Sequence, residues 1–166
     1  MHALRAALTV TAMSFGVGGV ALVTRRVPLT GGLLAAALTD QAGASGTFRG
    51  ALVVYATDLK ESLAGVPGPL LHVAGPVSDG TAAALAGGVR ERLGADWGIG
   101  VTGVAGPTEH DGHPVGTVFV AVAGPEEGQV VQLRLPGERE QVRARTVTAA
   151  LDLLRRHLSA EQPPRV

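Results

Sequence analysis

The sequence predicts an α/β layered domain with a mixed sheet, because strand-like apolar runs alternate with helical patterns before a hairpin and a final helix. A length of 166 residues is typical of one domain and suffices to bury a core. Hydrophobic residues make up 46% of the chain, which excludes an intrinsically disordered protein. Because we find no internal repeat and no interdomain linker, we expect a single domain.

The first 26 residues form an atypical apolar N-terminal segment. No charge occurs from Ala6 to Val23, a run of about 18 residues, which is the lower limit for a membrane span. Three glycines and three hydroxyl residues interrupt the run, and no clean cleavage site follows it. We therefore expect this segment to form buried secondary structure that contributes to the core, and we favour this over a membrane anchor or a signal segment.

The next elements follow in order along the chain. Leu33–Leu38, which follows a pair of glycines, consists of strong helix formers. Ala51–Tyr55 is a short apolar run typical of a strand that is buried on both faces. Thr57 can cap a short helix that ends near Leu63. We expect a loop at 67–76, where proline and glycine are frequent.

A longer helix and the hairpin come next. Ser78 is a good N-cap for a helix through Arg92, which the following Gly94 can end. The sequence then predicts one strand over 97–102 and, after a polar loop, two strands joined by a turn. The paired strands are expected at 116–123 and 129–135.

The last element is a helix over residues 138–158. Its apolar positions recur at spacings of four, three and four residues, which places them on one helix face: Val147, Leu151, Leu154 and Leu158. The segment 159–166 contains two prolines, and we expect it to be a flexible tail.

Charge and composition exclude several functions. Basic and acidic residues number 14 each, so no basic excess drives binding to nucleic acid or to an anionic membrane. Cysteine is absent, which excludes disulfides, thiolate catalysis and cysteine-based metal sites. The chain has one lysine, Lys60, and one tyrosine, Tyr55. We expect a cytoplasmic protein that binds neither nucleic acid nor a membrane.

Several segments together resemble one known family. They are Thr30–Asp40, Tyr55–Lys60 with Leu63–Val66, Gly75–Ser78, Val101–Pro107, Pro114–Thr117 and Pro136–Arg139. In this order they resemble the signatures of the CinA C-terminal domain, the nicotinamide mononucleotide amidohydrolase (deamidase). The resemblance implies a single-domain, three-layer α/β/α sandwich with a mixed sheet over residues 27–158.

The resemblance also implies a reaction and a site. The family hydrolyses the carboxamide of nicotinamide mononucleotide to nicotinate mononucleotide and ammonia, without metal or cofactor. A serine nucleophile is activated by a lysine and assisted by a tyrosine, positions that match Lys60 and Tyr55. The implied contacts to the pyridine nucleotide are Thr30, Gly31, Gly32, Thr102, Gly103 and Arg139. The chain could also associate with further copies of itself.

The chain departs from the family pattern at the nucleophile. Pro28 occupies the position of the serine, and Val27 replaces a glutamate. Proline has no nucleophilic atom and no N–H donor. Lys60 is nevertheless retained, and arginine could not replace it because a guanidinium does not deprotonate. We expect impaired hydrolysis. The alternative is a catalytically silent module that binds a nucleotide or a partner.

Three accounts of the missing serine remain open. In a silent relative, the backbone of Gly31 and Gly32 could still donate to a phosphate or carboxamide oxygen. Alternatively, Ser14 is a displaced nucleophile and 16–29 is an insertion. The third account is a shifted reading of the gene. The family's serine lies in a Thr-Ala-Glu-Ser stretch, and codons for this stretch, when read out of frame, give Arg-Arg-Val, the sequence at 25–27. The nucleotide sequence would separate these accounts.

Two further groups of side chains could bind ligands. The stretch 109–113 holds two histidines and two carboxylates and resembles a metal site, but we favour a solvated loop and expect no metal. Arg139 and Arg143 lie four residues apart, on one helix face. They could bind a phosphate, or they could be ordinary surface arginines.

Overall fold

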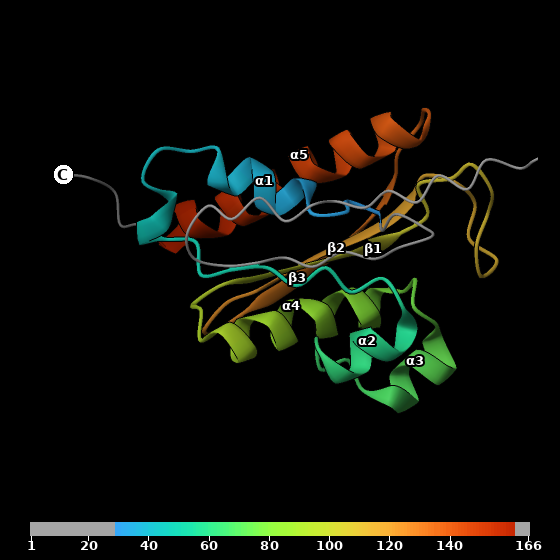
Figure 1. Ribbon diagram of the computed structural model, residues 1–166, viewed down its shortest axis with the longest axis horizontal. Helices are drawn as coiled ribbons and strands as arrows, with labels where there is room; N and C mark the ends of the chain where they lie inside the picture. The colour runs from blue at the N-terminus through green and yellow to red at the C-terminus, as the bar shows by residue number, and fades with distance from the viewer. Residues whose placement is uncertain (1–28, 162–166) are drawn as a thin grey trace, which may run out of the picture.

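The computed structural model describes residues 29–161 of the chain (Figure 1). The apolar segment 1–26, Ser14 and Pro28 lie outside the described residues, as does the end of the tail. The sheet has three antiparallel strands in chain order: β1 (Gly98–Gly103), β2 (Thr117–Ala123) and β3 (Gly128–Arg134). The strands expected near these positions are confirmed to within one residue at each end.

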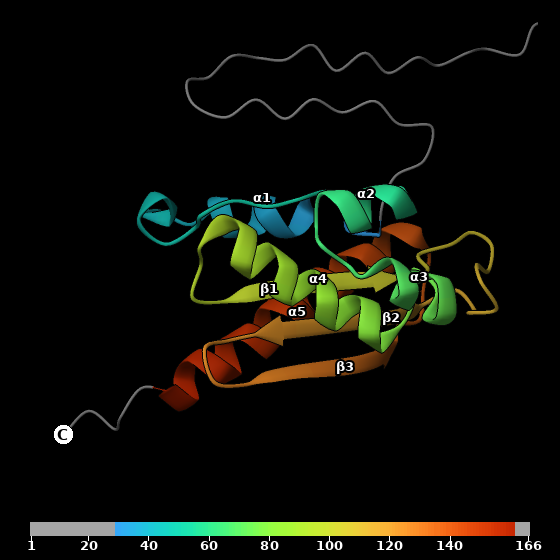
Figure 2. The same cartoon turned by 90° about the horizontal axis from the view of Figure 1, so that it is seen from below.

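Helices cover both faces of the sheet (Figures 1 and 2). One face carries α4 (Asp79–Leu93), with α2 (Thr57–Ser62) and α3 (Gly68–Ala74) beside it. The other face carries α5 (Arg139–Glu161), against which α1 (Leu33–Thr39) packs. A short 3-10 helix, η1 (Ala44–Gly46), follows α1. The predicted α/β class and its three layers are confirmed.

β2 is the centre of the core because both of its faces are covered. Val118, Val120 and Val122 pack in a cluster with side chains of α5. Phe119 and Ala121 point the other way and pack in a cluster with α4. Alternate side chains of a strand point to opposite faces, so the continuous run of apolar residues over 118–123 suits this doubly covered strand.

The predicted ends of α4 are confirmed. The Ser78 hydroxyl accepts a hydrogen bond of 3.1 Å from the Thr81 N–H, and Gly94 ends the helix with φ 57°. On β1, a Cβ built on Gly98 or Gly100 would lie 2.1 Å from a backbone oxygen of α4. These two glycines therefore let the helix approach the strand closely.

Two expectations about the first half of the chain are wrong. Thr57 is the first residue of α2 instead of its cap, and the cap position is Ala56. The expected loop at 67–76 contains α3, because Pro67 takes the cap position and a second proline lies in the first turn. A missing N–H has no cost in a first turn, since those groups have no partner within the helix.

Ala51–Tyr55 does not form the expected strand among the described residues. The segment is extended, but no described backbone hydrogen bond joins it to β1. Leu52 and Val54 pack on the cluster around Leu85, whereas the side chain of Val53 is 37% exposed. The described strands are all antiparallel, so no parallel pair of the expected mixed sheet occurs among them.

α5 differs from expectation in its length and its buried face. The helix continues to Glu161, beyond the expected end at 158. Its buried positions are Val142, Thr146, Ala150 and Leu153, and the last three each lie one residue before a predicted apolar position. Of the predicted positions, Leu154 packs on the core and Leu158 is 39% exposed. Within residues 29–161, no helix combines the length and the hydropathy needed to cross a membrane.

Candidate functional site

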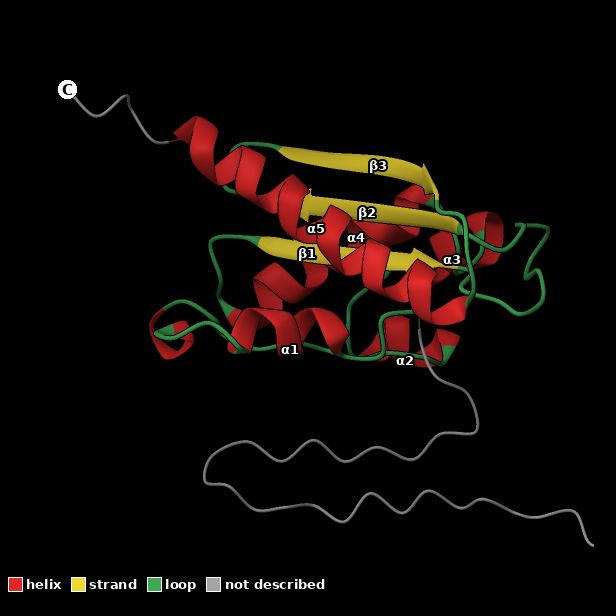
Figure 3. Ribbon diagram, turned by 90° about the horizontal axis from the view of Figure 1, so that it is seen from above, coloured by secondary structure: helices red, strands yellow, loops and turns green. Residues whose placement is uncertain are grey.

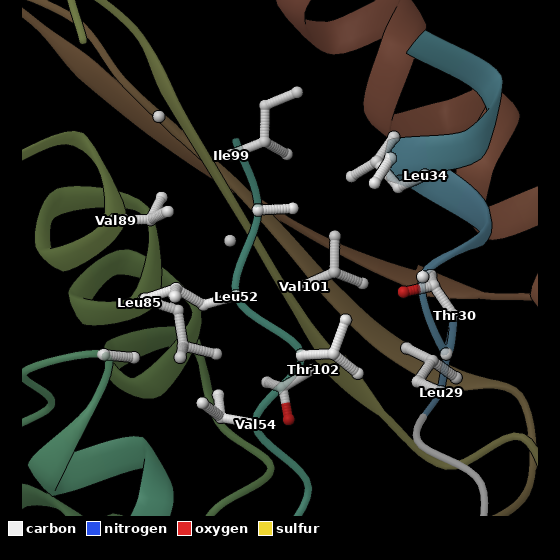
Figure 4. A pocket seen from close by; sticks show the side chains of 18 of the residues that line it. Leu29, Thr30, Leu34, Leu52, Val54, Leu85, Val89, Ile99, Val101 and Thr102 are labelled. Carbon is white, nitrogen blue, oxygen red and sulfur yellow. The ribbon is translucent and has the colours of Figure 1, made fainter. Parts of the chain in front are cut away.

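A cavity of about 1590 Å³ lies between β1 and the start of α1 (Figure 4). It is bounded by the turn before α1, the extended chain at 48–57, β1 and the loop after β1. Every described residue that the sequence proposed for the site lies on its lining: Thr30, Gly31, Gly32, Tyr55, Lys60, Thr102, Gly103 and Arg139. These residues come from four separate stretches of chain, which the fold brings to one cavity.

Lys60 is a buried ionisable group in the lining. It belongs to α2, and 8% of its surface is exposed. Its Nζ donates hydrogen bonds to the carbonyl oxygens of Tyr55 at 2.8 Å and Val54 at 3.3 Å. Burial lowers the pKa of Lys60, and the nearby charge of Asp58 opposes this shift in part. A lowered pKa increases the share of neutral amine, the form that can accept a proton.

We predict that the stability of the protein depends on pH through Lys60. The pKa of Lys60 in the folded chain is lowered from 10.5, so the unfolded state binds more protons in the window just below that value. Stability conferred by this residue therefore increases as the pH rises through the window. Lys60→Met should flatten the rise, which urea unfolding at a series of pH values would measure. Equal slopes for the two proteins would contradict the prediction.

Tyr55 and Thr102 line the same cavity but differ in their exposure. The side chain of Tyr55 is 39% exposed at the cavity. Thr102 is buried and donates a hydrogen bond of 2.6 Å to the carbonyl oxygen of Pro76. This bond joins the end of β1 to the turn before α4. The hydroxyl proton of Thr102 is therefore used in this hydrogen bond, and the hydroxyl oxygen could bind a ligand only as an acceptor.

The turn before α1 depends on its glycines. Gly31 and Gly32 have φ values of 58° and 91°, a region that disfavours side chains. The Leu33 N–H donates to the Thr30 carbonyl at 3.1 Å, and no side chain caps the helix. Gly103 is required for a different reason: a Cβ at this position would lie 2.5 Å from the carbonyl oxygen of Thr117. Gly103 is thus explained by close packing of the backbone.

The two arginines at the start of α5 both bind backbone carbonyls. Arg139 donates to the carbonyl of Gly106 in the loop after β1. Arg143 donates from Nε to the Leu29 carbonyl at 2.9 Å and from Nη2 to the Thr30 carbonyl at 3.1 Å. Arg143 therefore holds the turn that leads into α1, a role that sequence reasoning missed because its partners are more than 100 residues away in the chain.

We predict that Arg143→Ala loosens this turn. The substitution leaves two carbonyls without their charged donor, which should lower the free energy of unfolding by about 1–2 kcal/mol. Arg155→Ala is a matched control, because the Arg155 ion pair with Asp152 is exposed and should contribute little to stability. Urea unfolding measures both. If the Arg143→Ala protein were as stable as the control, Arg143 would not hold the turn that leads into α1.

The histidine-rich loop at 109–113 forms a small turn. The backbones of His110 and His113 bond to each other in both directions, and the intervening Asp111 and Gly112 have positive φ. The His110 ring lies 3.4 Å from the Asp111 carboxylate. In the described part of the chain, no three histidine or carboxylate side chains are placed to hold a metal ion.

Comparison with known proteins relates the chain to one family. Residues 28–158 match the family described as the CinA C-terminal domain. A CinA-like protein of Frankia casuarinae is 52% identical over 131 residues, which are 79% of this chain and 30% of that protein. A putative competence-damage inducible protein of Desulforamulus reducens is 45% identical over 132 residues, which are 80% of this chain and 32% of that protein. The chain thus spans about a third of the length of these relatives.

Solved structures share the fold. The competence damage-inducible protein A (ComA) of Klebsiella pneumoniae superposes with a TM-score of 0.78 at 32% identity, over 81% of this chain and 84% of that one. The competence/damage inducible protein CihA of Agrobacterium tumefaciens gives a TM-score of 0.70 at 35% identity, over 76% and 79% of the two chains.

Proposed function

The chain belongs to the CinA C-terminal domain family, and we propose that its cavity binds nicotinamide mononucleotide but hydrolyses the carboxamide poorly. The observation that carries this proposal is Lys60, the one lysine of the chain, buried in the cavity lining with a lowered pKa. The turn at Thr30–Gly32 lines the same cavity. A basic amine and an uncapped helix start on the lining of one cavity suit acid–base chemistry on an amide.

The reaction needs a nucleophile that this chain lacks at position 28. Hydrolysis breaks the carboxamide C–N bond and forms a C–O bond, and the departing NH2 group takes one proton to leave as ammonia. In the family pattern a serine oxygen attacks first, and water then releases the acid. In this chain water itself would have to attack, with Lys60 accepting its proton. We expect this route to be much slower, because the attacking oxygen is not held in place.

A silent binding module is the second candidate, and Pro28 is the observation that favours it. In this case the cavity would bind the nucleotide without turning it over. The same residues would then act only in recognition, and replacement of Lys60 would change affinity without any effect on catalysis.

Calorimetry and an ammonia assay on the purified chain test the proposal together. We expect binding of nicotinamide mononucleotide and slow release of ammonia, which Lys60→Ala abolishes and the control Arg155→Ala preserves. Binding with no ammonia above the buffer rate would favour the silent module. Absence of binding for both nicotinamide and nicotinate mononucleotide would refute the proposal.

A further inference from the structure

The loop between β1 and β2 brings a carboxylate to one end of the cavity. This loop covers residues 104–116 and projects beyond the ends of both strands (Figure 3). Its first part, up to His110, lines the cavity, and so does Arg139 at the start of α5. Two carboxylates of the described residues line the cavity, that of Asp96 before β1 and that of Glu109 after it. They therefore belong to opposite ends of that strand.

Glu109 follows the end of β1 at which the buried amine lies. The Lys60 Nζ donates to the carbonyl oxygen of Val54 at 3.3 Å. Figure 4 shows Val54 and Thr102 at one end of the cavity and Ile99 at the other. The loop that carries Glu109 begins just after Thr102, since β1 ends one residue later. The carboxylate is thus at the end of the cavity that holds the amine of the proposed reaction.

Contacts on both sides of Glu109 hold the loop in place. On one side, Arg139 donates to a backbone carbonyl of the loop. On the other side, the backbones of His110 and His113 bond to each other at 3.1 and 2.9 Å. The His113 ring packs edge-on against the buried Phe119, with 6.0 Å between the ring centroids. A side chain on a loop that is already ordered binds a ligand at a lower entropic cost.

Glu109 differs from the other acid of its loop in what surrounds it. The Asp111 carboxylate lies 3.4 Å from the His110 ring and is not part of the cavity lining. The Glu109 carboxylate forms no hydrogen bond or ion pair with any residue of the described range 29–161. The donors near this end of the cavity already bind backbone carbonyls: Lys60, Thr102 and Arg139. Glu109 therefore offers its acceptor oxygens to a donor on the ligand.

We propose that Glu109 binds the two neighbouring ribose hydroxyls of the nucleotide, an inference that rests on the proposed function of the same cavity. An ionised carboxylate only accepts hydrogen bonds, so it would repel the phosphate. The carboxamide nitrogen is a donor, but the reaction requires that group to lie at Lys60. The ribose presents two adjacent O–H donors, which match the two oxygens of one carboxylate. Glu109 would thus orient the sugar and select ribonucleotides.

Calorimetry with nicotinamide mononucleotide and its 2′-deoxy analogue tests this contact. The unaltered chain should bind the deoxy analogue about tenfold more weakly, because a hydrogen bond to a charged group is lost. Glu109→Gln should weaken binding of the ribonucleotide about tenfold and reduce its preference over the deoxy analogue to less than about threefold. Asp111→Asn makes the same change off the cavity lining and should leave both affinities unchanged. Both side chains are exposed, so urea unfolding should give both variants the midpoint of the unaltered chain.

The possible results separate this contact from its rivals. Unchanged affinity of the Glu109→Gln protein would overturn the inference, as would equal binding of the two nucleotides by the unaltered chain. If Glu109→Gln instead removed a preference for nicotinamide over nicotinate mononucleotide, the carboxylate would bind the carboxamide, and the assignment to the ribose would be wrong. In these cases the proposed function stands. Absence of binding to the unaltered chain would refute the proposed function, and this inference with it.

Discussion

Introducing Ser at position 28 and Glu at position 27 is expected to raise ammonia release from nicotinamide mononucleotide at least about a hundredfold, since loss of a nucleophile typically costs far more than this. The reason is chemical. The pyrrolidine ring of Pro28 offers no oxygen to the amide carbon, whereas the hydroxyl of a serine at this position could attack once Lys60 accepts its proton.

Two controls show whether the gain comes from the new oxygen. Val27→Glu with Pro28→Ala relieves the same backbone restriction but adds no hydroxyl, and it should stay at the background rate. Adding Lys60→Ala to the serine protein should remove the gain. If the alanine and serine proteins release ammonia equally fast, position 28 is not where the nucleophile belongs.

The neighbouring glycines of α4 are expected to respond to alanine in opposite directions. A Cβ at Gly88 would lie 1.8 Å from the carbonyl oxygen of Ala64, whereas a Cβ at Gly87 meets nothing within 4 Å. Gly88→Ala must therefore push the helix away from the chain that follows α2, which we expect to cost about 3 kcal/mol. Gly87→Ala should stabilise the helix by about 0.5–1 kcal/mol, since alanine restricts the unfolded chain.

Urea unfolding of the two alanine proteins gives the comparison directly. Because Ala64 follows the helix that carries Lys60, Gly88→Ala should also disturb the buried amine. The stability of the Gly88→Ala protein should then depend less on pH than that of the unaltered protein, as we expect for Lys60→Met. Two alanine proteins of equal stability would show that α4 does not approach Ala64 as closely as the structure has it.

Local patterns allowed correct prediction wherever a residue's neighbours in sequence decide its structure. Ser78 and Gly94 mark the ends of α4 through contacts within the helix itself. The hairpin of β2 and β3 follows from two apolar runs around a short turn. Proline and glycine at 67–76 predict a loop, but α3 forms there because proline is also favoured in the first turn of a helix.

Distant contacts explain the remaining differences. Ala51–Tyr55 has the composition of a buried strand, but a strand needs a partner in the sheet, and none of the described strands pairs with this segment. The role of Arg143 depends on carbonyls at the far end of the chain. The cavity residues could be grouped only through the family resemblance, because their spacing along the chain does not indicate that they meet.

A solitary, desolvated primary amine also makes this protein a simple target for covalent labelling. The uncharged form of an amine attacks acylating reagents, and Lys60 is the one side-chain amine of the chain and has a lowered pKa. An activated ester of a pyridine carboxylic acid should therefore modify a single internal position. The adduct would report by mass spectrometry whether a competing molecule occupies the cavity.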